Sequence, residues 1–152
     1  METIEYQPRK LFTVEEANRM LPLVRRIVAD ITSTYQKLVA KHERFRDLAP
    51  NGSVGVDSPQ WDKLADMRDE LEADQESLLA FAKELSDLGV ELKGEADGLV
   101  DFPALRDGRV VYLCWKQGEP NVGHWHEIAD GFRGRQPIDH SEAVPTISLP
   151  KE

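Results

Sequence analysis

Apolar residues recur at spacings of three and four between Leu23 and Leu48, which places them on one face of a long helix. Ahead of this stripe, Thr13-Val14-Glu15-Glu16 has the pattern of a capping box, so we expect a helix to begin directly after Thr13. Pro22 lacks an amide hydrogen, and we therefore expect a break near Met20-Leu21 with Pro22 opening a second helix.

A second long helix is predicted by leucines at strict seven-residue spacing and by a neighbouring apolar stripe that Asp74 interrupts. The breaker-rich stretch 49–57 reads as a loop, after which Asp57 or Ser58 is expected to cap the helix, with Pro59 in its first turn. Gly89 is expected to end it. Residues 14–88 should therefore form an antiparallel helical hairpin. The leucines are Leu64, Leu71, Leu78 and Leu85, and the neighbouring stripe is Met67, Phe81 and Leu88.

The period changes from helical to strand-like after Gly89. Residues 90–93 alternate, and 98–102 and 110–115 are rich in β-branched and aromatic side chains. Between the last two stretches, Asp107-Gly108 is typical of a tight hairpin turn, and Pro103 is expected at an edge position. The predicted class is α+β, a long helical hairpin followed by a small antiparallel sheet of two to three strands. Residues 1–137 are expected to form a single domain, with 138–152 as a C-terminal tail.

Charge and composition exclude several classes of partner. The 152 residues carry 19 basic and 28 acidic side chains, and the most acidic stretch, 58–97, holds 12 of the acids and four of the bases. Nucleic acids and anionic lipids require a basic face, so we expect neither partner. No apolar run is long enough to span a membrane and no signal peptide is visible. Cys114 is the only cysteine, which excludes intrachain disulfides and cysteine-built zinc sites; a cytoplasmic location is the expectation.

The apolar stripes of the two long helices are wider than one hairpin can cover, because Ile27 and Val39 lie off the main line. We therefore expect the hairpin to pack on the C-terminal part, on a second copy of the chain, or on both. A homodimer formed through the helices is the predicted assembly.

The stretch 98–137 is unlike the rest and contains the candidate chemistry. Asp101, Glu119, His126 and Glu127 combine carboxylates with imidazole, a donor set used for iron, manganese or zinc. If 123–128 is a strand, His124 and His126 project to one face; if it is a helix, the candidate ligands diverge. The alternative is structural, with His126 a buried imidazole bonded to a carbonyl and the acids capping turns or pairing with arginines.

Arginines near two tryptophans suggest a second chemistry. Guanidinium groups beside aromatic walls can form a pocket for a small carboxylate or phosphate. The competing explanation, which we favour, is that they neutralise the acidic second helix. Cys114 lies among apolar residues and is expected to be inert rather than a nucleophile. The residues concerned are Arg106, Arg109, Arg133 and Arg135 with Trp115 and Trp125.

Three motifs, DFPALRDGR, YLCWK-x-GEP and WHE-x-x-x-GF-x-GR, accompany FTVEEAN at residues 12–18. Through them the chain resembles DUF2203, a bacterial and archaeal family without an assigned reaction, over nearly its whole length to Pro137. The resemblance implies kinship and no activity, and His124 is not part of the family pattern.

Three hypotheses follow from the residues. The first is a small metal-binding protein holding one divalent ion of iron, zinc or manganese through Asp101, Glu119, His126 and Glu127. The second is a non-enzymatic module that self-associates through the helical hairpin, and the third is binding of a small anion by the C-terminal arginines. The residues do not decide whether the protein is an enzyme.

Overall fold

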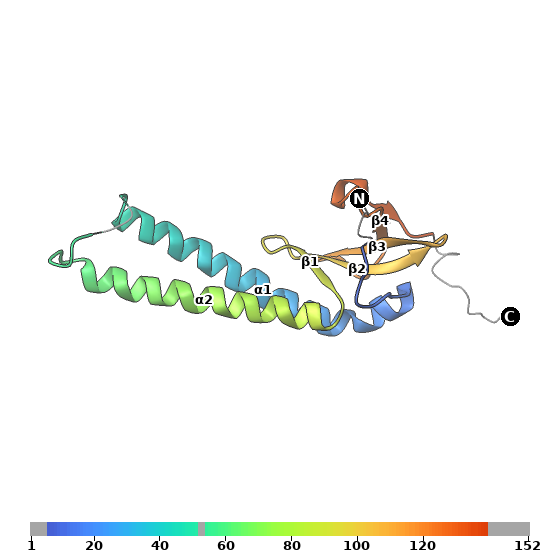
Figure 1. Ribbon diagram of the computed structural model, residues 1–152, viewed down its shortest axis with the longest axis horizontal. Helices are drawn as coiled ribbons and strands as arrows, with labels where there is room; N and C mark the ends of the chain where they lie inside the picture. The colour runs from blue at the N-terminus through green and yellow to red at the C-terminus, as the bar shows by residue number, and fades with distance from the viewer. Residues whose placement is uncertain (1–5, 52–53, 140–152) are drawn as a thin grey trace, which may run out of the picture.

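A computed structural model describes residues 6–51 and 54–139. Two long helices, α1 (Val14–Leu48) and α2 (Trp61–Asp87), form an antiparallel hairpin, and a five-stranded sheet packs at one end of it (Figure 1). The distal part of the hairpin extends away from the sheet. The α+β class and the hairpin are as predicted. From residue 140 onward, the predicted C-terminal tail lies outside the described residues.

The expected capping box is present at the start of α1. The Thr13 hydroxyl accepts from the Glu16 amide at 3.0 Å, and the Glu16 carboxylate accepts from the Thr13 amide at 2.9 Å. The predicted break at Pro22 is wrong, because α1 continues through it. Pro22 lies on the exposed side of the helix, where water can bond the carbonyl that loses its partner, while Leu21 and Val24 pack in the core on the opposite side.

The ends of α2 follow local hydrogen-bonding rules. The prediction that Asp57 or Ser58 caps this helix, with Pro59 in its first turn, is wrong. The helix begins at Trp61 after Gln60, whose side chain makes no capping bond, and the Ser58 hydroxyl accepts from the Gln60 amide within the preceding turn. At the other end Gly89, with φ of 88°, adopts the left-handed conformation predicted for a C-cap glycine. The amides of Gly89 and Val90 then bond the carbonyls of Ser86 and Leu85 in a Schellman motif.

Asp74, which interrupts the apolar stripe of α2, pairs with Lys41 across the helix seam at 2.8 Å. Both side chains are largely shielded from solvent, and Glu70 lies 3.6 Å from the same ammonium group. The interruption therefore supplies a polar contact that helps to fix the register of α1 against α2.

The sheet is larger than predicted. It runs β1 (Glu91–Gly94), β2 (Leu99–Arg106), β3 (Arg109–Lys116), β4 (His124–His126) and β5 (Gln136–Pro137), with every neighbouring pair antiparallel. The expectation of two to three strands is thus wrong. The strands β4 and β5 have three and two residues, too few to show an alternating pattern, and they form because they pair on β3 and on each other.

The predicted turn fixes the longest strand pair. Asp107 and Gly108 both have positive φ, 52° and 79°, as a type I′ turn requires, and they join β2 to β3 with Arg106 opposite Arg109. Pro103 lies beyond the end of β1, and its carbonyl accepts from the Phe12 amide at 2.7 Å on the edge side. Its missing amide therefore costs no strand pairing, as expected for an edge proline.

The two faces of the sheet differ in chemistry. The inner face packs against α1 and the end of α2 in one apolar core, whereas the outer face presents Asp101, Tyr112, Cys114 and His126. The alternation along each strand separates the two sets. The sheet contributes to the core Val100, Phe102, Ala104, Val111, Leu113, Trp115 and Trp125.

In the described parts of the chain, neither helix has an apolar stretch of the length and hydrophobicity needed to cross a membrane.

Replacing Gly89 with alanine should destabilise the fold. The left-handed conformation costs an L-residue about 1–2 kcal/mol, and the new Cβ would lie 2.9 Å from Cβ of Lys10. Urea unfolding of Gly89→Ala should show a loss in that range. The matched control is Gly55→Ala, where a Cβ meets nothing within 4 Å. Equal stability of the two variants would contradict the assigned role of Gly89.

Candidate metal centre

Three adjacent strands bring Asp101, Cys114 and His126 together on the outer face. Asp101 lies in β2 directly opposite Cys114 in β3. His126 in β4 lies opposite Tyr112, which is the next residue to Cys114 on the same face of β3. The three residues are 2%, 0% and 2% exposed. One ligand atom from each lies within 4.8 Å of the other two. The outer face therefore contains a buried cluster of potential ligands.

The orientation of the His126 ring is set by a backbone carbonyl. Its Nδ1 lies 2.7 Å from the Glu127 carbonyl oxygen, which can only accept, so Nδ1 carries a hydrogen and donates. Its Nε2 lies 3.1 Å from both carboxylate oxygens of Asp101. Because two acceptors facing one another would repel, a proton or another cation has to lie between Nε2 and the carboxylate.

Burial dominates the electrostatics of the cluster. It raises the pKa of Asp101 above its ordinary value, with the neighbouring His126 acting in the opposite direction. Burial, together with the negative charge of Asp101, raises the pKa of the Cys114 thiol to about 12. At neutral pH the thiol is therefore protonated, and it lies opposite Asp101 across the β2–β3 pair.

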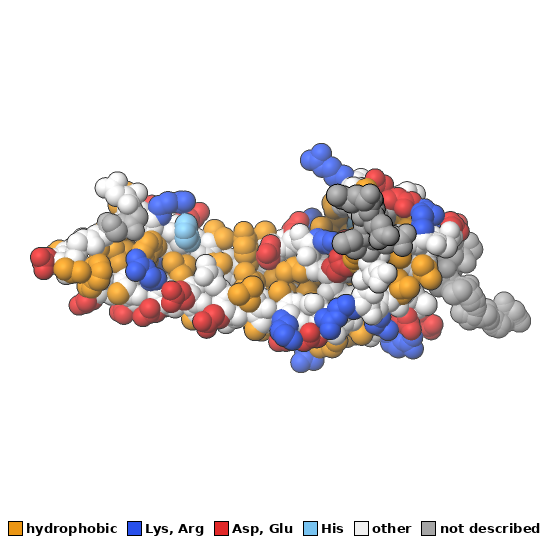
Figure 2. Space-filling model, in the orientation of Figure 1, with side chains coloured by type: hydrophobic (Ala, Val, Ile, Leu, Met, Phe, Trp, Pro, Cys, Tyr) orange, Lys and Arg blue, Asp and Glu red, His pale blue; other side chains and the backbone are white. Residues whose placement is uncertain are grey.

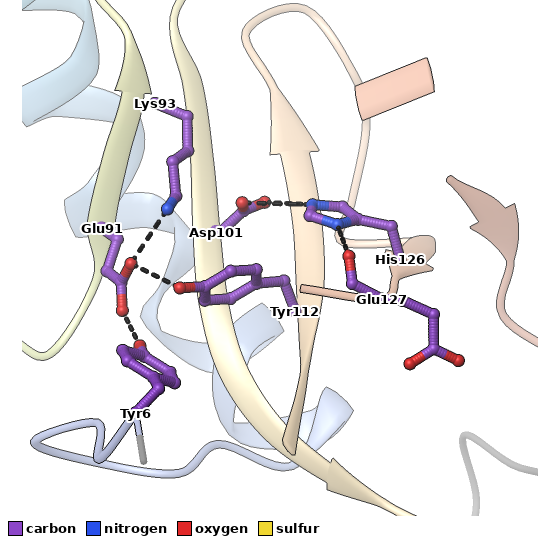
Figure 3. A network of polar contacts seen from close by, with 7 residues as sticks. All are labelled: Tyr6, Glu91, Lys93, Asp101, Tyr112, His126 and Glu127. Carbon is purple, nitrogen blue, oxygen red and sulfur yellow. Dashed lines mark hydrogen bonds and ion pairs between the residues drawn. The ribbon is translucent and has the colours of Figure 1, made fainter. Parts of the chain in front are cut away.

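A second polar layer lies beside the cluster (Figure 3). The Tyr112 hydroxyl donates to Oε1 of Glu91 at 2.7 Å, and the Lys93 ammonium group pairs with the same oxygen at 3.1 Å. The Tyr6 hydroxyl donates to the other oxygen of Glu91. The Tyr112 ring centroid lies 5.5 Å from that of His126, so this polar layer adjoins the cluster directly.

The four sequence-predicted ligands divide into two groups. Asp101 and His126 meet, as described. Glu119 instead accepts from the Lys116 amide at 2.9 Å and pairs with Arg135. The Glu127 side chain points away from the imidazole and pairs with Arg109, while its carbonyl orients the ring (Figure 3).

Sequence reasoning treated Cys114 as an inert strand residue and did not place it among the ligands. The signal was present in the turn, because a two-residue loop at Asp107-Gly108 puts Cys114 directly opposite Asp101. Of the two possibilities for residues 123–128, the strand is confirmed, over residues 124–126. His124 and His126 face the same side of this strand, as expected. His124 contacts Arg135 instead of the cluster.

The candidate anion ligands are spread over both faces. Trp115 and Trp125 are buried in the inner core, where the Trp115 indole donates to the Glu119 carbonyl at 3.0 Å. Arg109 and Arg135 each pair with a glutamate of the sheet region and not with α2, whereas Arg133 is exposed in the short 3-10 helix Phe132–Gly134. Arg109, Arg133 and Arg135 therefore do not converge with the tryptophans on one cavity.

The family model for an uncharacterized conserved protein, DUF2203, matches residues 10–138, which cover the hairpin and all five strands. The chain belongs to the DUF2203 family. The match includes the three residues of the buried cluster, so a DUF2203 domain in this chain carries both the hairpin and the candidate centre. Comparison with the curated proteins and with the solved structures gave no significant match.

The Cys114 thiol should resist alkylation in the native protein. With a pKa of about 12, it holds about a thousandth of the thiolate that an ordinary cysteine has near pH 8. Native iodoacetamide labelling, followed by mass spectrometry, should therefore be slow and should become fast in urea. A Ser77→Cys variant supplies an exposed comparison thiol on α2. Equal native labelling at positions 77 and 114 would contradict the protection assigned to Cys114.

Proposed function

We propose that this DUF2203 protein binds one divalent transition-metal ion through Asp101, Cys114 and His126. The observation that supports the proposal is the approach of a carboxylate, a thiol and an imidazole from three strands to within 4.8 Å of one another. Around a tetrahedral zinc ion, donor atoms lie about 3.3–3.8 Å apart for bonds of about 2.0–2.3 Å. Small side-chain movements would therefore let the three donors share one ion.

The tautomer of His126 favours metal binding. The Nδ1–H group donates to the Glu127 carbonyl, which directs the Nε2 lone pair toward Asp101. This is the arrangement in which metal-ligating histidines are usually held, with the second ring nitrogen bonded to a carbonyl or carboxylate. A divalent ion would take the place of the proton between His126 and Asp101 and would also displace the proton of Cys114, so binding releases protons.

The donor set narrows the choice of ion. A thiolate and a carboxylate together balance a 2+ charge, which offsets much of the cost of burying the ion. Thiolate favours zinc or iron over manganese, which prefers oxygen donors. Glu119 and Glu127 are left out of the proposed set because arginines bind their carboxylates. The three residues are at most 2% exposed, and because a tetrahedral ion takes four ligands, they would leave one position for water or another ligand.

Elemental analysis and cobalt spectroscopy test the metal site. Protein prepared without a histidine tag should hold about one zinc or iron per chain after reconstitution. Cobalt substitution should give a sulfur-to-cobalt charge-transfer band, and metal should raise the melting temperature. Cys114→Ala should lose the band and bind metal more weakly. His126→Gln should also bind metal more weakly, because it removes the imidazole ligand.

The control for these variants is His124→Gln, on the same strand and face but outside the cluster. It should keep the full metal content. A wild-type protein that takes up neither zinc, iron nor cobalt, or a Cys114→Ala variant that binds them as tightly as the wild type, would overturn the proposed site.

A second candidate function is self-association through the hairpin. Fully buried side chains of α1 lie between Ala17 and Thr32, beside the sheet, whereas the apolar seam residues farther along, such as Tyr35, Leu38 and Leu78, are only half-buried. Leu79 is 71% exposed, and apolar atoms run along the visible face of the hairpin (Figure 2). A second copy packed on this hairpin would form a four-helix bundle and cover these groups.

Light scattering after size exclusion tests the homodimer. The wild type should be dimeric at micromolar concentration, and Leu79→Glu should be monomeric because it places a charge on the apolar surface of the hairpin. Leu105→Glu is the matched control, since Leu105 is 61% exposed at the far end of the sheet. A monomeric wild type, or a Leu79→Glu variant that stays dimeric, would contradict self-association through this face.

A further inference from the structure

A cavity of about 330 Å³ lies on the inner face of the sheet, on the opposite side from the candidate metal centre. Its floor is formed by Ala104, Val111, Leu113 and Trp125, at the end of the sheet near the β2–β3 turn. The first turn of α1 and the segment leading into it form the other wall. Ala104 has the smallest side chain of the floor and leaves room where a larger residue would fill the core.

The walls of the cavity are held before any ligand arrives. Ala104 pairs with Val111, and Leu113 pairs with Trp125, in the antiparallel ladder. The opposite wall is fixed by the bond from the Phe12 amide to the Pro103 carbonyl, 2.7 Å long, and by the Thr13–Glu16 capping box. A site formed in advance loses little conformational entropy on binding.

The lining is apolar at the floor and cationic at one rim. The Arg106 guanidinium lies 4.2 Å from the Trp125 ring centroid at this rim. Arg109 lies 6.0 Å from the same centroid but does not line the cavity, and its guanidinium pairs with Glu127. Arg106 lines the cavity directly. It already makes other contacts and interacts electrostatically with Glu127, and its five donors allow it to bind a carboxylate as well. Exposed Leu105 and Leu11 mark the open side.

We propose that this cavity binds a small carboxylic acid with an apolar body, such as a medium-chain aliphatic acid. The apolar body would contact the floor around Leu113 and Trp125, and the carboxylate would pair with Arg106 at the rim. The volume lies within the range of small-molecule sites, and a few polar groups at an otherwise apolar site are typical of ligand orientation. This site is separate from the metal centre and does not depend on it.

Octanoate and 1-octanol are the probes that test this proposal. Calorimetry and methyl NMR shifts of Val111 and Leu113 should show saturable binding of octanoate to the full-length protein. Binding of 1-octanol should be weaker by about tenfold, because it lacks the charge that pairs with Arg106. No saturable octanoate binding, or 1-octanol binding equally well, would overturn the proposal.

Two variants locate the binding. Ala104→Leu extends into the cavity and should abolish octanoate binding without lowering the melting temperature, whereas Ala73→Leu, the same change at an exposed site on α2, should have no effect. Arg106→Gln should weaken octanoate by about tenfold and leave 1-octanol unchanged, and exposed Arg133→Gln is its control. Arg106 lies at the rim and not in the core, so Arg106→Gln still tests the site if Ala104→Leu does not fold. Unchanged octanoate affinity in both cavity variants would overturn the site.

Discussion

The pairing of β2 with β3 is the constraint on which the rest of the sheet depends. A two-residue turn at Asp107-Gly108 fixes the register of eight residue pairs, from Arg106 opposite Arg109 to Leu99 opposite Lys116. A shift of one residue would exchange the two faces of a strand and place its core residues in solvent. The same register decides which apolar side chains meet α1 and which polar side chains gather on the outer face. It also provides the edge of β3 on which the short strand β4 pairs, and β4 in turn pairs with β5.

The cost of burying Asp101 and His126 explains the organisation of the outer face. A buried carboxylate or imidazole is stable only when its polar atoms are satisfied. Here each nitrogen of His126 has a partner, and Asp101 contacts the imidazole and lies opposite Cys114. The neighbouring Tyr112–Glu91 bond extends the polar contacts toward β1. A cation between His126 and Asp101, whether a proton or the metal ion proposed above, would satisfy the polar atoms of both residues.

The hairpin serves two environments along its length. Near the sheet, α1 is covered on one side by α2 and on another by the strands, so residues such as Val24, Val28 and Ile31 are fully buried. Farther out the two helices cover only each other, and the cross-seam pair Lys41–Asp74 contributes specificity as well as contact. Near the sheet, α1, α2 and the strands together enclose the apolar side chains, whereas farther out only the two helices do so. The apolar side chains in the distal half of the hairpin are therefore incompletely buried.

Local patterns in the sequence were sufficient for the elements that are long or that depend on neighbouring residues. Helical periodicity predicted both long helices, and the capping box, the C-cap at Gly89 and the Asp107-Gly108 turn were each identified from a few adjacent residues. Tertiary packing decided the rest. It kept α1 continuous through Pro22, because the lost bond lies on the solvent side, and it created β4 and β5, which are too short to have a pattern of their own. In the candidate centre, sequence identified Asp101 and His126, and the local turn at Asp107-Gly108 already implies that Cys114 lies opposite Asp101. The approach of His126 to Asp101, and the pairing of Glu119 and Glu127 with arginines, depend on how β4 and its neighbours pack, which local preferences do not encode.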